Sequence, residues 1–185
     1  PRFVFLHLHK SGGTFVNEAL LRFVSGARHI GYHLPRTRLP AEHARLPVVG
    51  LVRSPWSYYV SWYAFQRSLP RPSALLQVLS DAGRLGFAGT VARMLDLGRN
   101  DELLDRVLAV LPTDYGQSGL NLPAHALASI RGRTVGFYSF LFDHVFAPAG
   151  ADSLTIVRLE NLHDELTTAL RRLGQAVDDD FRKHL

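Results

Sequence analysis

A short polar turn near the N-terminus carries residues suited to holding an anion. His9-Lys10-Ser11-Gly12-Gly13-Thr14 follows residues 3–8, an apolar run typical of a parallel strand buried on both sides, and precedes a helical pattern that begins at residue 15. A glycine-rich turn lets main-chain N–H groups converge on an anion, and the positive end of the following helix points at the same spot. Lys10 adds a full charge, and two hydroxyl side chains add donors. The turn therefore predicts a phosphate or sulfate site.

The order of residues distinguishes this turn from the common nucleotide-binding loops. In a Walker A loop the lysine follows the glycines, whereas Lys10 precedes Gly12 and Gly13. The turn does not fit the G-x-G-x-x-G pattern of dinucleotide-binding folds either. It is a pattern of its own, K-S-G-G-T.

A second strand-to-helix junction places another cation at a strand end. Residues 48–52 read as a buried strand, and Arg53-Ser54-Pro55 closes it with a helix-capping serine and a proline suited to the first helical position. A guanidinium at such an end offers a fork of donors to a dianion. Ser61 lies about two turns along the helix, on the face that also carries Ser54 and Ser57. Taken alone, Arg53 is better explained by an ordinary surface ion pair, and only the two linked motifs together favour the anion site.

The elements that position these residues alternate between strand and helix. Residues 154–158 read as a third buried strand, and Asn161 is expected to cap a final helix that stops at Gly174. We therefore predict an α/β fold with a P-loop-like parallel sheet flanked by helices on both faces. Residues 73–111 read as a helical insertion that covers a site, and residues 112–133 as loop. No linker divides the chain, so residues 1–185 are expected to form one domain.

The quoted motifs resemble those of the PAPS-dependent sulfotransferases. Residues 7–14 look like the 5′-phosphosulfate loop of the carbohydrate-type branch, H-x-P-K-[ST]-G-G-T, except that His9 stands where that branch has proline. Residues 52–63 resemble the pattern that binds the 3′-phosphate of the donor, an arginine followed eight residues later by a serine. Residues 157–162 resemble a third segment of these enzymes, in which Arg158 and Glu160 are expected to be structural.

The resemblance implies a donor, a reaction and a set of site residues. The donor is 3′-phosphoadenosine-5′-phosphosulfate (PAPS), the product is adenosine 3′,5′-bisphosphate, and no metal is required. Catalysis falls to Lys10, which offsets charge on the leaving group, and to a base, for which His33 is the first choice because it matches a G-H-x-P-like segment with Tyr32 interposed. The predicted nucleotide-binding residues are Lys10, Ser11, Gly12, Gly13, Thr14, Phe15, Arg53 and Ser61.

Other candidates for the base remain open at the level of sequence. Glu18 falls on the polar face of the first predicted helix, four residues before Arg22, which favours an ordinary ion pair. His29 is a further candidate. His7 lies too close to the phosphate loop to be an obvious base and reads as a packed residue. A histidine suits proton abstraction near neutral pH, because its ordinary pKa is about 6.5.

Composition sets the remaining expectations. A net charge of +5 fits a polyanionic ligand, and it leaves open a nucleic-acid-binding domain, although no nucleic-acid motif occurs. A P-loop kinase is the other alternative, but the strand ends carry arginine rather than the aspartate that a magnesium site needs. We expect a small-molecule or glycan acceptor and no nucleic-acid partner. Without cysteine or an apolar span, we expect a bacterial cytoplasmic enzyme, with a trimmed Golgi-type lumenal domain as the alternative.

Overall fold

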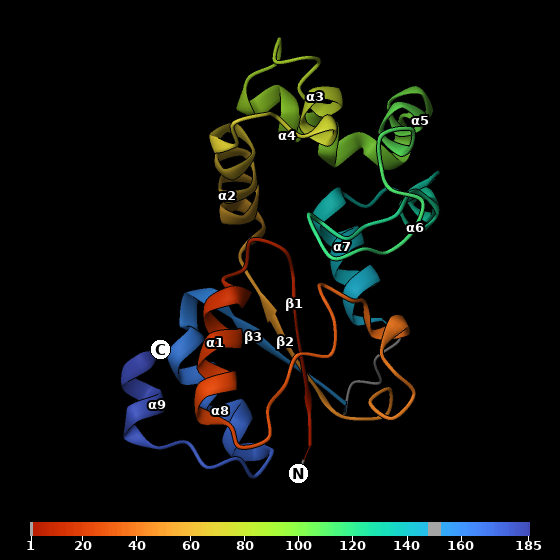
Figure 1. The fold of residues 1–185 in the computed structure, drawn as a ribbon. Coiled ribbons are helices and arrows are strands. Elements are labelled where there is room, and N and C mark those ends of the chain that lie inside the picture. The colour runs from red at the N-terminus through yellow and green to blue at the C-terminus, as the bar shows by residue number, and fades with distance from the viewer. Residues whose placement is uncertain (1, 148–152) are drawn as a thin grey trace. The chain divides into compact units, whose positions relative to one another are not determined.

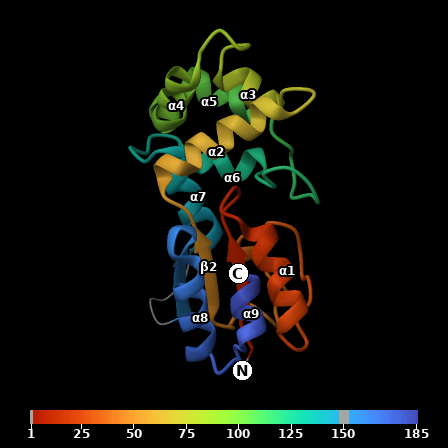
Figure 2. The same ribbon diagram turned by 90° about the vertical axis from the view of Figure 1, so that its left-hand side faces the viewer.

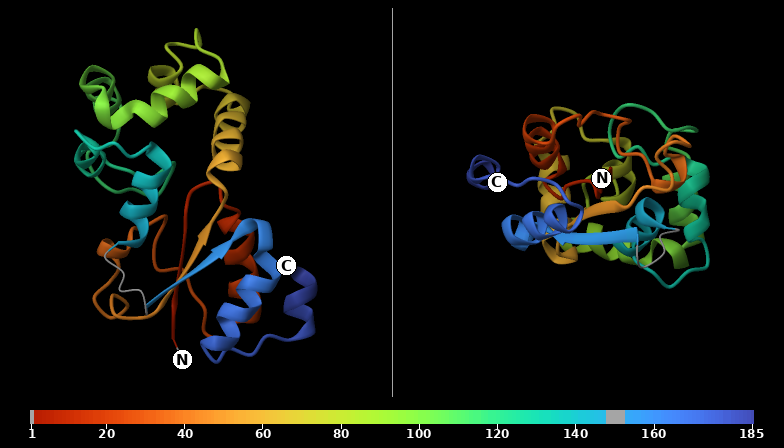
Figure 3. Two further views of the ribbon diagram at one scale, coloured as in Figure 1. Left: turned by 180° about the vertical axis from the view of Figure 1, so that it is seen from behind. Right: turned by 90° about the horizontal axis from the view of Figure 1, so that it is seen from below.

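Three apolar runs form a parallel sheet in the computed structural model, which describes residues 2–147 and 153–185. The strands are β1 (Val4–His7), β2 (Val48–Val52) and β3 (Leu154–Arg158), in the order β1-β2-β3. Both pairings are parallel, with Val4 opposite Val48 and Val48 opposite Leu154. Every residue of β2 is buried, which explains its unbroken run of apolar residues. Seen from behind, β3 is the nearest strand, with β2 beside it (Figure 3, left).

One face of the sheet is covered by helices from both ends of the chain. They are α1 (Gly13–Phe23), α8 (Leu162–Arg172) and α9 (Asp179–His184). Figure 2 shows all three on the side of the sheet that faces the viewer. Their apolar side chains form one core with the side chains on that face of the strands: Val16, Ala19, Leu20, Val49, Leu51, Val157, Leu166, Ala169, Leu170 and Phe181.

The opposite face meets the end of α7 (Phe137–Phe146). A Cβ atom on Gly50 of β2 would lie 2.7 Å from the ring of Phe146, so only glycine fits there without movement of that ring. The short 3₁₀ helix Arg36–Arg38 belongs to the segment that leads from α1 to β2. The predicted class, a parallel sheet flanked by helices, is confirmed (Figure 1).

The chain divides into two compact units. The first, called the sheet unit here, consists of Pro1–Ser54 and Val145–Leu185. The second, the helical unit, is Pro55–His144. Its helices are α2 (Pro55–Ser68), α3 (Ala74–Leu79), α4 (Phe87–Asp96), α5 (Asp101–Leu108), α6 (Ala124–Leu127) and most of α7. The expected helical insertion over residues 73–111 lies inside this unit, and the prediction of one sulfotransferase domain stays a prediction.

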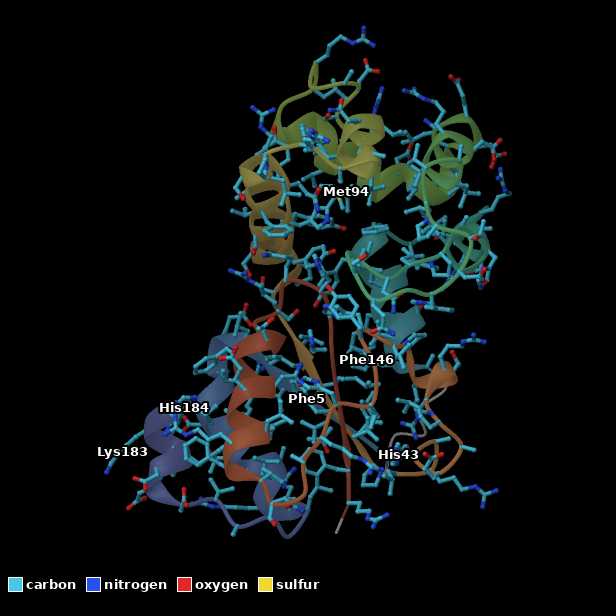
Figure 4. All side chains as sticks on the ribbon, viewed as in Figure 1. Phe5, His43, Met94, Phe146, Lys183 and His184 are labelled. Carbon is cyan, nitrogen blue, oxygen red and sulfur yellow. The ribbon has the colours of Figure 1, made fainter. Side chains whose placement is uncertain are left out.

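The helical unit has its own core and its own caps. Trp62, Met94 (labelled in Figure 4) and Phe137 are almost completely buried. Ser73 begins α3 by accepting the Leu76 N–H at 3.1 Å, and Asn100 caps α5 in the same way. These helices therefore form from local signals that the sequence displays.

Four details differ from the sequence-based expectations. The stretch expected as loop, residues 112–133, contains α6 and the 3₁₀ helix Ala128–Ile130. Asn161 makes no side-chain capping bond; its amide instead donates to Glu165 at 3.2 Å. Helix α9 follows Gly174 and was not expected. Residues 3–8 were expected to be buried on both sides, but β1 is an edge strand that alternates between buried and half-buried positions. No helix among the described residues is long and apolar enough to cross a bilayer.

Candidate anion-binding site

The Lys10 turn has the backbone geometry of an anion cradle. Lys10 and Gly12 both adopt left-handed conformations, with φ of 63° and 80°. Gly12 ends the turn, and its carbonyl accepts the first helical bond of α1, from Val16 N–H at 3.3 Å. A left-handed lysine is uncommon, and such strained residues concentrate at functional sites.

The start of α1 offers donors to a ligand. The first N–H groups of a helix have no partner within it, and the helix dipole makes that end positive. The Ser11 side chain gives an independent sign: it is fully buried, yet its hydroxyl has no hydrogen-bond partner among the described residues. Buried hydroxyls are normally satisfied. This orphaned donor fits a phosphate or sulfate oxygen at the turn.

Two cations meet at the turn. The Arg53 guanidinium donates to the main-chain carbonyl of Lys10 at 3.4 Å, so the ends of β1 and β2 share one site. Burial lowers the pKa of the Lys10 ammonium, and the positive charge of Arg53 lowers it further. A dianion between these groups would reverse that repulsion.

The end of β3 anchors the Arg53 junction. Glu160 accepts the Ser54 N–H at 2.8 Å, and Leu159 lies against Gly12, where an added Cβ would come within 2.9 Å of its side chain. Two nitrogens of the Arg158 guanidinium donate to one carboxylate oxygen of Glu165, on α8, and these bonds hold the pKa of that carboxyl at about 2. These contacts agree with the structural roles expected for Arg158 and Glu160.

Three histidines pack together beside the turn. The ring centroids of His7 and His33 are 4.5 Å apart, and those of His9 and His33 are 5.4 Å apart. His7 Nδ1 lies 3.1 Å from the Leu8 carbonyl, which fixes that nitrogen as the donor and leaves Nε2 as an acceptor. His33 has a left-handed backbone, with φ of 45°. The predicted base, His33, is therefore a neighbour of the Lys10 turn.

These histidines are held neutral by their surroundings. Burial is the main cause, and neighbouring histidines add to it, so the pKa of His33 falls to about 3. The pKa of His9 falls to about 4 through burial and the charges of Lys10 and His7. Burial also lowers the pKa of His7. At neutral pH each ring carries a lone pair that can accept a proton.

The remaining predicted site residues have other neighbours or belong to the other unit. The Phe15 ring stacks on His184, with ring centroids 5.7 Å apart, and the predicted role of Phe15 stays a prediction. Ser61 lies in α2, within the helical unit, and its predicted role stays a prediction. The expected pair between Glu18 and Arg22 is not formed among the described residues; the Arg22 guanidinium lies 5.1 Å from the Phe23 ring centroid instead. No cluster of three or more potential metal ligands occurs within residues 2–147 and 153–185.

A cavity that the sequence did not reveal adjoins the histidines. It has a volume of about 510 Å³ and is lined by β1, by α1 and by the segment that follows α1. His7, Thr14 and His33 line it, as does His29, the other candidate base. Phe5 and His43, both labelled in Figure 4, belong to its walls. Residues 3–8 carry no alternation of apolar and polar residues that would have signalled a half-exposed strand beside a cavity.

The fold is that of a sulfotransferase. The structure is similar to a crystal structure of the mouse sulfotransferase SULT7A1 complexed with PAP, at 14% sequence identity and a TM-score of 0.50. The similarity covers 98% of this chain and 61% of the mouse chain, so this chain spans less than two thirds of the mouse protein's length. No protein-family model matches the sequence, and no curated protein matches it. The closer resemblance to the carbohydrate-type branch stays a prediction.

Proposed function

We propose that the sheet unit binds PAPS and that the chain is a sulfotransferase that moves the sulfuryl group to an acceptor hydroxyl. The observation that carries the proposal is the contact of Arg53 with the main chain of Lys10. This contact brings two cations and the start of α1 together where β1 and β2 end side by side. The fully buried Ser11 hydroxyl supports the same reading. The shared fold with a sulfotransferase structure that contains PAP adds support.

Each group has a role in the proposed transfer. Main-chain N–H groups of the turn and α1 hold the 5′-phosphate, and Lys10 offsets charge on the oxygen that links phosphorus to sulfur. Arg53 binds the 3′-phosphate, with Ser61 as its predicted partner. The acceptor oxygen attacks sulfur in line, the bond from sulfur to the bridging oxygen breaks, and His33 takes the acceptor's proton. The products are a sulfate ester and adenosine 3′,5′-bisphosphate.

His33 is suited to this role by position, and bound nucleotide would tune its pKa. A base with a pKa of about 3 is weak, and efficient general bases titrate nearer the working pH. Negative charge on the donor next to the ring raises that pKa toward the useful range. Because the His33 ring is neutral before the nucleotide binds, it does not have to lose a proton before it can accept one from the acceptor hydroxyl.

Calorimetry with adenosine 3′,5′-bisphosphate tests the nucleotide site. Binding is expected without any metal and unchanged by magnesium, whereas a magnesium requirement would favour a P-loop kinase. Lys10→Ala and Arg53→Ala should each weaken binding by about 10- to 100-fold, the usual effect of losing a charge-assisted contact. Arg171→Ala, which removes an exposed arginine at the end of α8, is the matched control. Unchanged affinity in Lys10→Ala would remove that residue from the site.

A separate measurement tests the base. His33→Ala should lower kcat by about 10²- to 10⁴-fold, the range for general base catalysis, while affinity for the nucleotide changes little. Normal turnover in His33→Ala would transfer the role to another group, for which His29 and Glu18 are the candidates to substitute next.

A further inference from the structure

Strand β1 leaves one edge of the sheet without a partner strand among the described residues. The N–H groups of Val4 and Leu8 donate to Pro47 and Leu51, at 2.9 Å and 3.0 Å. Main-chain groups of successive residues in a strand point to opposite sides. The N–H and C=O groups of Phe5 and His7 therefore point away from β2. No hydrogen bond between described residues involves the main chain of Phe5.

The cavity beside the histidines runs along this open edge. Five consecutive residues of the β1 segment, from Phe3 to His7, line it. Its opposite walls come from α1 and the segment after it, and their apolar side chains include Leu21, Val24, Leu34 and Leu46. One end reaches His7 and His33, so a molecule held along β1 extends to the proposed reaction centre.

The chemistry of the walls selects among acceptors. No aspartate or glutamate lines the cavity, and Arg2 and Arg28 give it positive charge. Asn17 and Gln175 are the side-chain amides of its lining, and three hydroxyl side chains and four histidines complete the polar groups. A row of main-chain donors and acceptors is matched by another extended main chain, and partly buried edge groups are costly when they stay unpaired. Strand addition satisfies them, while the apolar parts of the walls take alternate side chains.

We propose that the acceptor is a hydroxyl side chain on an extended polypeptide that pairs with the free edge of β1. This inference rests on the proposed sulfotransferase function and names its substrate class. The paired segment advances about 3.3 Å per residue along β1, which brings a tyrosine, serine or threonine near His7 to His33 and the Lys10 turn. The positive lining favours a segment with acidic residues. The hydroxyl oxygen forms the new bond to sulfur, and its proton passes to His33.

The test uses an octapeptide with one central tyrosine flanked by valine and aspartate, added to the whole chain with adenosine 3′,5′-bisphosphate. A second peptide carries serine in place of tyrosine to separate the two hydroxyl types. Phe5→Pro removes an N–H that points away from β2 and so removes no β1–β2 bond, a substitution that edge strands tolerate. We expect it to weaken peptide binding by about tenfold or more, the effect of losing main-chain pairing. Phe5→Val keeps the N–H group and is the matched control, with a loss of about threefold or less.

Peptide methylation gives a readout that needs no protein variant. N-methyl groups placed at each position in turn should block binding at alternate residues only, because alternate N–H groups of a paired strand face β1. The Phe5 amide should exchange rapidly with solvent in the free chain and become protected when peptide binds. Equal effects at all positions, or wild-type affinity in Phe5→Pro, would overturn the proposal. Nucleotide affinity is measured in the same samples. If the peptide binds but the nucleotide does not, the proposed sulfotransferase function is refuted, while the proposal that a peptide pairs with β1 is retained.

Discussion

Gly13 and His7 share one small space at the start of α1. A Cβ atom on residue 13 would lie 2.1 Å from the His7 ring, far inside contact distance. Gly13→Ala is therefore expected to lower the free energy of unfolding by about 1–3 kcal/mol, the usual cost of overpacking, and to weaken nucleotide binding. Urea unfolding measures the first effect and calorimetry the second.

A double variant separates this clash from a general effect of alanine. The variant His7→Ala/Gly13→Ala lacks the imidazole ring that the new Cβ would meet. Adding Gly13→Ala to the His7→Ala chain should therefore lower the free energy of unfolding much less than adding it to the wild-type chain. Gly116→Ala is the control, because a Cβ there meets nothing within 4 Å. If the losses in the free energy of unfolding of the two single variants simply add up in the double variant, the expected clash between residue 13 and the His7 ring is contradicted.

The neutral histidines make stability depend on pH. The pKa values of His9 and His33, about 4 and about 3, lie below the ordinary 6.5. At a pH between these lowered values and 6.5, the unfolded chain therefore binds more protons than the folded chain. The free energy of unfolding should fall as the pH drops from 6.5 through this window. Each group contributes at most ~1.4 kcal/mol per pH unit, and solvent reduces the share of the half-buried His33.

Urea titrations at pH 7 and pH 5 measure this dependence. The variant His9→Gln/His33→Gln should lose less stability between the two pH values than the wild-type chain, because neither glutamine titrates. His163→Gln, at a half-exposed position on α8 for which no such burial applies, serves as the control. An equal loss in the double variant would assign the acid sensitivity to other groups.

At the scale of elements, the ends of the three strands are linked by two contacts, one through the Glu160 carboxylate and one through the Arg53 guanidinium. Glu160 follows β3 and accepts the N–H of Ser54, which follows β2, while Arg53 contacts the turn after β1. Glu160→Ala should therefore loosen the position of Arg53 and weaken nucleotide binding by about fivefold, the effect of one exposed hydrogen bond to a charged group. Calorimetry measures the change. Glu160→Gln keeps an acceptor and should retain most of the affinity; identical losses in both variants would point to charge instead.

At the scale of the whole molecule, the unfolding of the two units can be followed separately, because the tryptophans lie in one of them only. Lys10 and Arg53 lie in the sheet unit, whereas both tryptophans, Trp56 and Trp62, lie in the helical unit with Ser61. Nucleotide at 100 times its dissociation constant stabilises the unit that binds it by ~2.7 kcal/mol. The unfolding transition measured by circular dichroism should move to higher denaturant concentration when nucleotide is added. The transition measured by tryptophan fluorescence should move as well only if Ser61 also binds the nucleotide. A fluorescence transition that ignores the nucleotide would remove Ser61 from the site.

Local patterns in the sequence were sufficient to predict the strands over residues 48–52 and 154–158, the helices after the two junctions, and the turn between residue 8 and α1. Each depends on neighbours along the chain: apolar runs, a glycine pair, a capping serine, a proline at the first helical position. The same reasoning missed α7 and α9, and it placed a cap on Asn161 that does not form.

Tertiary structure alone decided the contacts between residues far apart in the chain. The meeting of His7 with His33, the contact of Arg53 with Lys10 and the bond from Ser54 to Glu160 all depend on the order of strands in the sheet. That order also made β1 an edge strand and so created the cavity along it. Periodicity records which face of an element is buried, but the partner that buries it is set by packing across the whole sheet, which no local pattern encodes.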